Sequence, residues 1–458
     1  MSAEFVAADP YTRLVSRVLF PLHERLKHHS TVAALRELER SQFLPRDELD
    51  RLQSQRLRRL LERAATRVPY YRALFAERGI DWREIRAATD LARLPLLSKA
   101  DIRAAADRLR ADDAGALSAA STSGSTGESL TFYLGRERVS HDVAAKWRAT
   151  RWWGVDIGDP EVVLWASPIE SGSQDRLRDL RDRLLRSHFI DARDLSEARV
   201  PHLLAQIERA DPRMLFGYTS ALARLAAFAL QRGQQLHCPR LKVVFVTAAK
   251  LGEQQRANIR QVFGAPVADG YGGRDAGFIA HECPAGTMHL TEEDLIVEIV
   301  DDDGAPLPPG ESGEIVVTHL ASGDFPFIRY RTGDRGRLGS PTCPCGRTLR
   351  GLQAIEGRMN DMLVGEGGRV MHHTGISNVL KDVAGLLNYK VIQEREDLVR
   401  VQIVASRPIA VADREHIRGQ MRAFLGPALV TEIEQVPDIA PEPSGKHRYI
   451  VNRVRQVA

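Results

Sequence analysis

Cysteine is scarce in this chain. The 458 residues include only Cys238, Cys283, Cys343 and Cys345, too few for a disulfide scaffold. No apolar run approaches the roughly 20 residues that span a bilayer. The first residues, Met1–Phe5, lack the basic and apolar regions of a secretory signal. We therefore expect a cytoplasmic protein with reduced thiols and no membrane partner.

An excess of charge of one sign is also missing. The formal net charge is +4, from 64 Lys and Arg against 60 Asp and Glu, and the two signs are interspersed. Nucleic-acid binding usually requires a basic stripe or patch, so we expect no nucleic-acid partner. Only eight of the basic residues are lysines. A lysine inside a chemically suggestive motif is therefore more informative than an arginine.

The length and the hydrophobic pattern indicate a globular protein of more than one domain. Two buried strands, Val162–Ala166 and Leu241–Val246, alternate with helical stretches over Thr219–Arg232 and Gly252–Phe263. Alternating strands and helices predict an α/β layer with parallel strands. Helical spacing also predicts helices over Leu49–Ala65 and Asp101–Arg110.

The pattern changes near residue 288. Strands over Asp294–Val300 and Gly313–Thr318 flank the turn Asp301–Gly304, which is hairpin chemistry. Short mixed strands and helices follow Gly357. The fold class we expect is α/β, with a large N-terminal α/β domain over 1–356, a β-rich subdomain over about 288–356, and a small α+β C-terminal domain over 357–458.

A loop rich in Ser, Thr and Gly, Ser121–Gly127, precedes a strand over Leu130–Tyr133. Glycines allow close backbone approach to a ligand, and hydroxyls with free N–H groups can surround phosphate oxygens. A flexible linker has a similar composition. The loop lacks the lysine of a P-loop. Composition alone leaves phosphate binding and a linker equally open.

Five ordered motifs together resemble the adenylate-forming superfamily of acyl-CoA synthetases and adenylation domains. The first is the loop Ser121–Gly127, and the others are Asp269–Asp275, Tyr330–Asp334, Gly357–Leu363 and Pro443–Lys446. The resemblance is greatest to the phenylacetate–CoA ligase group, which includes coenzyme F390 synthetases and capsule-biosynthesis proteins. Its markers here are Arg67–Arg72, Leu94–Lys99, Glu282–Gly286 and Cys343–Arg347.

The resemblance implies activation of a carboxylic acid with ATP and Mg²⁺, then transfer of the acyl group to coenzyme A. It assigns ATP or AMP binding to Ser121, Thr122, Ser123, Gly124, Ser125, Thr126, Gly127, Gly270, Tyr271, Gly272, Asp334 and Arg358. Within this set, Tyr271 would border the adenine ring and Asp334 would accept the ribose hydroxyls. Relatives often form dimers, so a homodimer is one possible assembly.

Lys446 is the implied catalytic residue. A compact ammonium on a flexible stem can bridge the α-phosphate and the attacking carboxylate, although both are anionic. Asp275 stands where the family usually has a Glu that helps hold Mg²⁺, and Arg274 replaces a small hydroxyl residue. Asn360 stands at the hinge position, where relatives carry Asp or Lys. There the C-terminal domain of the family rotates between the two half-reactions.

These departures keep other acceptors open. The acyl group could pass to an amine, a hydroxyl or a carrier protein, and a degenerate, non-catalytic nucleotide-binding protein is a second alternative. Family geometry assigns the acyl pocket to Trp147, Phe216, Tyr218 and Ala248. These largely aromatic and apolar side chains suit an aryl or arylacetic acid, although each could equally be core packing.

Two short-spaced pairs, Cys283 with His289 and Cys343 with Cys345, could supply four tetrahedral ligands to a structural Zn²⁺. The pairs lie at the two ends of the β-rich unit, which such a metal would clamp. His281 is a rival ligand. Two unrelated pairs of inert thiols remain the alternative.

Overall fold

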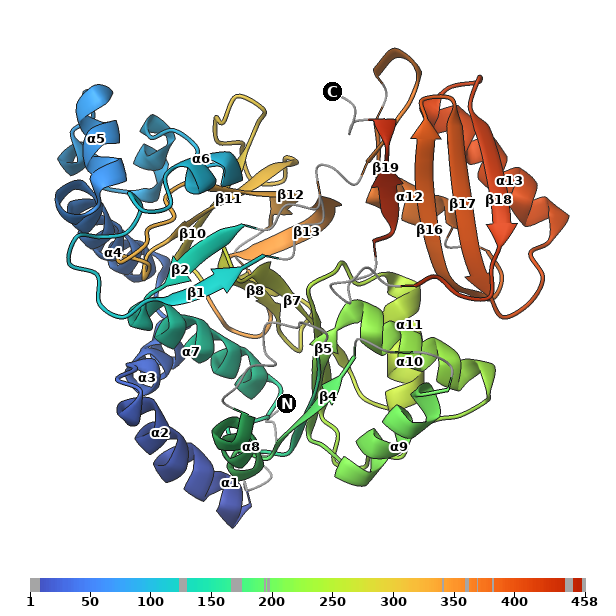
Figure 1. Cartoon of the computed structure of the whole chain (residues 1–458), viewed down its shortest axis with the longest axis horizontal. Helices are drawn as coiled ribbons and strands as arrows, with labels where there is room; N and C mark the ends of the chain where they lie inside the picture. Colours follow the sequence, from blue (N-terminus) through green and yellow to red (C-terminus); the bar gives the residue numbers. More distant parts are fainter. Residues whose placement is uncertain are drawn as a thin grey trace.

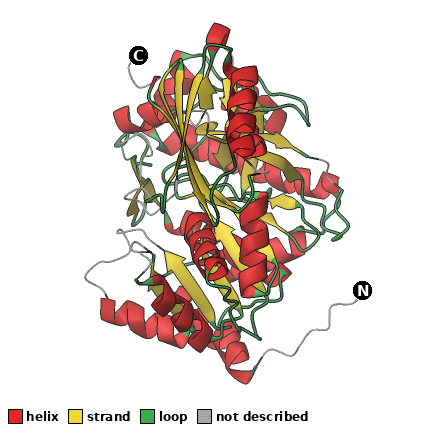
Figure 2. Ribbon diagram, turned by 90° about the vertical axis from the view of Figure 1, so that its right-hand side faces the viewer, coloured by secondary structure: helices red, strands yellow, loops and turns green. Residues whose placement is uncertain are grey.

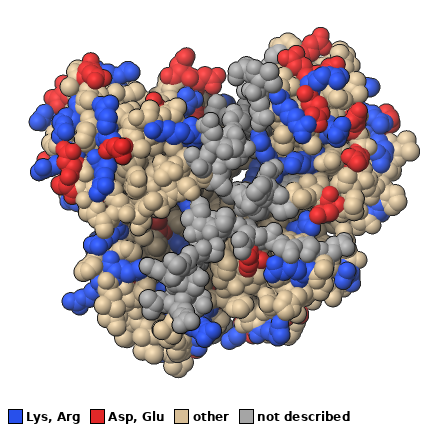
Figure 3. All heavy atoms as spheres, viewed as in Figure 1, with Lys and Arg blue, Asp and Glu red and all other residues tan. Residues whose placement is uncertain are grey.

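The computed structural model describes residues 9–122, 130–165, 175–192, 195, 198–339, 342–358, 362–368, 370–380, 383–440 and 448–454. Two bodies are visible in Figure 1, a large N-terminal part and a smaller C-terminal part beside α10 and α11. On the face in Figure 3, Lys and Arg are interspersed with Asp and Glu. In the described ranges, no helix combines the length and apolar character that crossing a bilayer requires.

The large part is built on one sheet of eleven strands, with the order β10-β11-β12-β13-β9-β8-β7-β6-β5-β3-β4. The strands are β3 (Glu161–Trp165), β4 (Ser187–Asp191), β5 (Met214–Tyr218), β6 (Val243–Thr247), β7 (Val267–Gly273), β8 (Gly277–Glu282), β9 (Met288–Leu290), β10 (Leu295–Val300), β11 (Gly313–His319), β12 (Tyr330–Leu338) and β13 (Gly351–Arg358). Side chains of β5 are buried along its whole length, as expected for a parallel strand covered on both faces.

Strands β4, β3, β5, β6 and β7 are parallel, as the sequence predicts. Helices cover both of their faces (Figure 2). One face packs on α9 (Val200–Ala210), α10 (Thr219–Gln231) and α11 (Glu253–Phe263). The other packs on α7 (Arg136–Trp152), through Ala149 against Phe216 and Phe245.

The β-rich strands do not form a sheet of their own. The β7–β8 hairpin is antiparallel, so β8 and the strands after it continue the parallel sheet in antiparallel pairing. The expected subdomain is therefore an antiparallel half of one sheet. Its core is shared with N-terminal helices, through Leu60, Leu61 and Phe75.

The helices before α7 are α1 (Pro10–Leu14), η1 (Val15–Leu19), α2 (Phe20–Leu26), α3 (Thr31–Ser41), α4 (Arg46–Arg67), α5 (Pro69–Glu77), η2 (Trp82–Glu84), η3 (Ala88–Arg93) and α6 (Lys99–Ala104). α4 confirms the predicted helix over Leu49–Ala65. α6 begins with a capping box, because Ser98 Oγ accepts from the Asp101 N–H while Asp101 accepts from the Ser98 N–H. It ends before Arg110, the predicted end, and the Arg108 carbonyl accepts from the Tyr70 N–H instead.

The C-terminal part has its own sheet, ordered β18-β17-β16-β19. Its elements are β14 (Met362–Val364), β15 (Val370–His372), α12 (His373–Leu380), β16 (Leu386–Arg395), β17 (Leu398–Ala405), α13 (Val411–Leu425), β18 (Val430–Gln435) and β19 (Ile450–Asn452). A separate apolar core includes Val401, Ile417 and Met421. This is the α+β unit expected at this end of the chain. The domain boundary at residue 356 stays a prediction.

Candidate active site

The predicted adenine motif lies where β7 ends at the carboxyl edge of the parallel strands. Ligands of open α/β sheets bind at this edge. A Cβ at Gly270 would lie 2.8 Å from Phe245 Cε1, and one at Gly272 would lie 2.3 Å from the Gly277 carbonyl oxygen. Both positions are therefore glycine because β7 is packed tightly against its neighbours.

The predicted adenine and ribose residues meet directly. The Tyr271 hydroxyl donates to Asp334 Oδ2 at 2.9 Å. Burial, and then the charge of Asp334, raises the pKa of Tyr271 well above its ordinary value, so the phenol keeps its proton. The backbone of Arg358 on β13 pairs with that of Asp334 on β12. The side chain of Arg358 lies outside the described structure.

Asp275 lies in the turn between β7 and β8. Its Oδ2 accepts a hydrogen bond of 2.6 Å from the Tyr330 hydroxyl. Tyr330 is the first residue of β12, the strand that also carries Asp334. Strand β12 therefore contacts Asp275, the predicted magnesium ligand, and also carries Asp334, the predicted ribose ligand.

Arg138 supports the same turn and was not found from the sequence. Its Nη2 donates to the carbonyls of Arg274 and Asp275 at 3.3 and 3.0 Å, and its Nε donates to Asp142 at 3.1 Å. The other oxygen of Asp142 lies 3.4 Å from His319 Nε2. Burial lowers the pKa of His319 to about 4. An arginine near a helix start in an Arg-rich chain carries no motif that could have revealed this role.

The ends of the predicted phosphate loop are joined by a short hairpin. β1 (Ser118–Ser121) pairs with β2 (Thr131–Leu134). The Thr122 N–H donates to the Leu130 carbonyl at 3.0 Å, and the Leu130 N–H donates to Thr122 Oγ1 at 3.2 Å. Ser121 and Thr122 are thus fixed at the base of the loop. Ser123, Gly124, Ser125, Thr126 and Gly127 lie outside the described residues.

Two of the predicted acyl-pocket residues form an aromatic wall with Trp165. The Trp165 ring stacks on Phe216, with centroids 6.0 Å apart, and lies 4.2 Å from the Tyr218 ring. Ala248 follows β6 at the same edge and has a φ of 71°. A non-glycine residue seldom adopts this left-handed conformation outside functional or strained sites. The sequence marked Trp165 only as a strand residue.

Trp147 lies in another core. Its ring packs edge-on against Phe20, in a cluster with α1 to α3. Lys146 connects the two regions, because its Nζ lies 4.7 Å from the Trp147 ring centroid and 4.8 Å from that of Phe216. The same Nζ is 3.4 Å from Glu161 Oε2. The structure therefore places Phe216 and Tyr218 beside Trp165, whereas Trp147 belongs to a different apolar cluster.

Asp269, at the start of the predicted adenine motif, is a half-buried acid. Burial, and then the charge of Glu282, raises the pKa of Asp269 to about 7. Glu282 Oε2 accepts from the Asp269 N–H at 2.8 Å and from Arg256 at 2.9 Å. Burial also lowers the pKa of Lys250, which lies near Asp269. Lys446 and Asn360, the predicted catalytic and hinge residues, lie outside the described residues.

The four predicted zinc ligands converge. One ligand atom from each of Cys283, His289, Cys343 and Cys345 can be chosen so that all lie within 4.8 Å of one another. Cys283 Sγ is 3.7 Å from Cys343 Sγ, and His289 Nε2 is 3.2 Å from Cys345 Sγ. The rival His281 instead stacks on Phe278, 5.3 Å between centroids.

The surroundings of this cluster orient its histidine. The Leu349 carbonyl, 2.8 Å from His289 Nδ1, accepts a hydrogen bond from the Nδ1–H, which leaves Nε2 free as a ligand. Trp152 packs edge-on against the imidazole at 5.8 Å. Burial raises the pKa of the Cys283 thiol, so a thiolate there requires a compensating cation. The donor set fits a tetrahedral zinc site.

Two family models match parts of the chain. A model described as AMP-binding enzyme matches residues 186–321, and one described as CapK C-terminal domain matches residues 363–453. Phenylacetate-coenzyme A ligase of Thermus thermophilus is 28% identical over 399 residues, covering 80% of this chain and 83% of the relative. Protein CapK of Staphylococcus aureus is 22% identical over 417 residues, covering 89% and 90%.

Solved structures of 2-hydroxyisobutyryl-CoA ligase share the fold. The postadenylation state in complex with R3-HIB-AMP matches with a TM-score of 0.73 at 21% identity, covering 91% of each chain. The thioesterification state, with 2-HIB-AMP and CoA, matches with a TM-score of 0.58 at 22% identity, covering 91% of this chain and 92% of the other.

Proposed function

This chain belongs to the phenylacetate–CoA ligase-like group of the adenylate-forming superfamily, and we propose that it activates a carboxylic acid with ATP and passes the acyl group to coenzyme A. The observation that carries the proposal is the hydrogen bond between Tyr271 and Asp334. It joins two nucleotide motifs, distant in sequence, at the edge of the sheet where ligands bind.

In the first half-reaction, a carboxylate oxygen of the acid attacks the α-phosphorus of ATP. The bond from that phosphorus to the bridging oxygen breaks, and pyrophosphate leaves. Lys446 would stabilise the charge shared by the two anionic reactants. Asp334 and Arg358 would hold the ribose. Tyr271, with Gly270 and Gly272 on either side of it in the sequence, would border the adenine. The loop Ser121–Gly127 would bind the phosphates.

Mg²⁺ would neutralise phosphate charge, with Asp275 as a hard oxygen ligand. Asp275 is shorter than the usual Glu, and its Oδ2 already accepts from Tyr330. Its Oδ1 accepts from the Ala276 N–H at 3.1 Å. Both carboxylate oxygens are thus oriented by fixed donors, which supports a preorganised ligand.

In the second half-reaction, the thiol sulfur of coenzyme A attacks the acyl carbon of the adenylate. The bond from this carbon to the AMP oxygen breaks, AMP leaves, and the thiol proton passes to solvent. Asn360 would serve as the hinge between the two arrangements. Asn adopts unusual backbone angles more readily than most residues.

ATP–pyrophosphate exchange over a panel of acids tests the first step. Lys446→Ala should lower exchange by at least about 100-fold, since it removes a charge aligned with the transition state. Lys27→Ala is the matched control and should retain exchange. Mass analysis with and without coenzyme A then identifies the acceptor. An amide or ester product, or a wild type without exchange for any acid, contradicts the ligase proposal.

An aryl or arylacetic acid is the substrate class we propose. Support comes from the wall of Trp165, Phe216 and Tyr218, which offers flat apolar surface at the sheet edge. Phe216→Ala should raise KM for an aryl acid far more than KM for ATP. A panel in which a short 2-hydroxy acid outperforms phenylacetate would contradict this assignment.

We also propose that Cys283, His289, Cys343 and Cys345 hold a structural Zn²⁺. The convergence of the four ligand atoms and the hydrogen bond from His289 Nδ1 to Leu349 support it. The ion would fasten the loop between β12 and β13 to the β8–β9 hairpin. Metal analysis of protein never exposed to chelator should give about one equivalent. Less than half an equivalent would contradict the site.

A further inference from the structure

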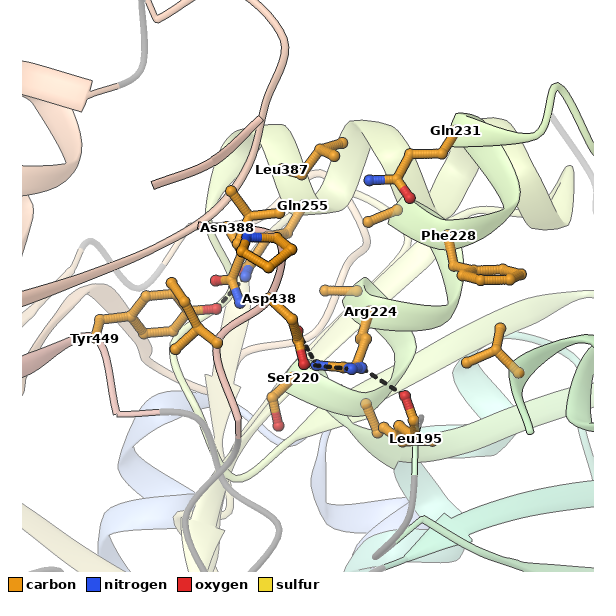
Figure 4. Close-up of a pocket in the computed structure, with 17 residues that line it drawn as sticks. Leu195, Ser220, Arg224, Phe228, Gln231, Gln255, Leu387, Asn388, Asp438 and Tyr449 are labelled. Carbon is orange, nitrogen blue, oxygen red and sulfur yellow. Dashed lines mark hydrogen bonds and ion pairs between the residues drawn. The ribbon is translucent and has the colours of Figure 1, made fainter. Parts of the chain in front are cut away.

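Two polar contacts join the C-terminal domain to the large domain in Figure 4. Arg224 of α10 forms a two-pronged ion pair with Asp438, in which Nη2 lies 2.7 Å from Oδ2. The side-chain amide of Gln255, in α11, donates to the Tyr449 hydroxyl. Figure 4 shows both pairs reaching across the gap between the domains.

The two large-domain side chains, Arg224 and Gln255, also form hydrogen bonds within their own domain. Arg224 Nε donates to the Leu195 carbonyl at 2.7 Å, so all three guanidinium nitrogens are engaged. Gln255 Oε1 accepts from the Gly252 N–H at 3.0 Å, which leaves its amide nitrogen directed at Tyr449. A side chain fixed in advance loses less conformational entropy when its partner arrives.

The two C-terminal partners stand on either side of the predicted catalytic residue in the sequence. Asp438 precedes Lys446 and Tyr449 follows it. Asp438 comes after β18 and Tyr449 comes before β19, and these are the two edge strands of the C-terminal sheet. The large domain therefore contacts the chain both before and after Lys446 in the sequence.

The contact between the domains also includes a pocket. This pocket lies between the two pairs, lined from the large domain by Ala227, Phe228 and Gln231 and from the C-terminal domain by Leu387, Asn388 and Val404. The apolar cores on either side are separate clusters. Relative motion of two domains is the default expectation unless one large apolar interface joins them.

We propose that Arg224 and Gln255 are positioning residues for the first half-reaction. They hold the C-terminal domain, through Asp438 and Tyr449, where Lys446 can act during adenylate formation. Both contacts must break before the domain can rotate for thioester formation. The inference rests on the proposed function, because it assigns Lys446 to the first step.

The test compares the two half-reactions in Asp438→Ala and Tyr449→Phe, measured in the full-length protein. ATP–pyrophosphate exchange should fall about three- to fivefold in each variant, the range expected for a partly exposed ion pair or one hydrogen bond. Transfer of the acyl group from a preformed acyl-adenylate to coenzyme A should stay within about twofold of wild type. Removal of both contacts should reduce exchange further.

Asp397→Ala is the matched control. Asp397 is an exposed aspartate of the same domain, and it pairs with Arg395 rather than with the large domain. It should leave both half-reactions unchanged. In a cycle of Arg224→Ala, Asp438→Ala and the double variant, the losses of ATP–pyrophosphate exchange should be non-additive. Either single variant already removes the ion pair.

Equal losses in both half-reactions, or full additivity of Arg224→Ala with Asp438→Ala, would overturn the proposal. Unchanged exchange in the Asp438→Ala, Tyr449→Phe double variant would also overturn it. Hydrogen–deuterium exchange of peptides from α10 and α11 gives a readout that needs no activity, and the double variant should exchange faster there. A wild type without ATP–pyrophosphate exchange would contradict the proposed function. Slower hydrogen–deuterium exchange of the α10 and α11 peptides in the wild type than in the double variant would still show the domain contact.

Discussion

Arg138 is a buried cation that donates hydrogen bonds to the turn carrying Asp275, a predicted metal ligand. It contacts the carbonyls of Arg274 and Asp275, and its charge is balanced by Asp142. A guanidinium forms several directed bonds at once, whereas an ammonium is a single point of charge. Arg138 is therefore expected to fix the position of Asp275 relative to bound nucleotide.

Arg138→Lys should raise the Mg²⁺ concentration that gives half-maximal ATP–pyrophosphate exchange. It should also destabilise the fold by about 1–3 kcal/mol, because buried carbonyls lose their donor. The Mg²⁺ titration is the decisive measurement, since a purely structural role would lower the melting temperature alone. Arg72→Lys, at an exposed ion pair with Asp112, is the control and should alter neither quantity.

Asp269 should make stability depend on pH. Its folded pKa of about 7 lies above the ordinary value of 3.8, so the folded state favours the neutral acid. The associated stability is present below about pH 4 and is lost as pH rises toward 7. Asp269→Asn cannot ionise, so its free energy of unfolding relative to wild type should rise over this range.

The large-domain transition in denaturant unfolding from pH 4.5 to pH 8 measures this difference. The expected rise is on the order of 1–4 kcal/mol, and it should level off above about pH 7. Glu253→Gln, at the exposed start of α11, is the comparison and should give no such trend. A difference between Asp269→Asn and wild type that is constant with pH would show that Asp269 ionises at its ordinary pKa.

Short sequence motifs identify some residues of the candidate site and miss others. Tyr271 and Asp334 stand in short patterns that the family shares, and the structure brings them into hydrogen-bond contact. Arg138 and Trp165 act through elements far apart in sequence, so no local pattern identifies them. Trp147 stays a predicted pocket residue, and its ring packs edge-on against Phe20.

Among elements, the loop between β12 and β13 depends on contacts outside the sheet. It carries Cys343 and Cys345, and Arg347 stacks on Trp152 at 4.5 Å while donating to Gln42 at 3.0 Å. These contacts attach the loop to α3 and α7. A metal at the cysteines would add a second attachment to β8 and β9.

Cys345→Ser should lose the bound zinc and lower the melting temperature by several degrees. A thiolate ligand contributes directly to the free energy of a closed structural site. Metal analysis and thermal unfolding measure the two effects. Cys238→Ser is the matched control, since this buried thiol belongs to another core and should leave the metal content unchanged. Full zinc content in Cys345→Ser would contradict the proposed ligand set.

Elements with a clear hydrophobic pattern are predictable from the sequence. The strands near 160–165 and 243–247 are continuous apolar runs, as expected for buried parallel strands. The helices near 219–231 and 253–263 follow these strands in the alternation typical of an α/β layer. Sheet membership was not predictable. Hairpin chemistry near residue 301 indicates antiparallel pairing, but it does not reveal that β8 and β9 join these strands to the parallel half.

At the scale of the whole molecule, the large domain and the C-terminal domain have separate apolar cores. One core lies between the sheet and α9 to α11, and the other lies within the C-terminal sheet and its helices. Units with separate cores and a polar contact unfold with limited cooperativity. The chain is therefore expected to depart from two-state unfolding.

Calorimetry should show a calorimetric enthalpy larger than the van't Hoff enthalpy, as for two linked transitions. A non-reactive acyl-adenylate analogue should bring the transitions closer together, because a ligand held by both domains stabilises their association. Nucleotide without the acyl group is the control and should shift chiefly the large-domain transition. A single two-state transition without ligand would contradict the independence of the domains.

The pocket between Phe228 and Leu387 has a pharmacological consequence. A compound that filled it would contact both domains and act as a molecular glue for the arrangement in Figure 4. Such an inhibitor would not compete with ATP or the acid, because none of the residues predicted to contact them lines this pocket. By the proposal above, it would hold the enzyme in the arrangement for adenylate formation.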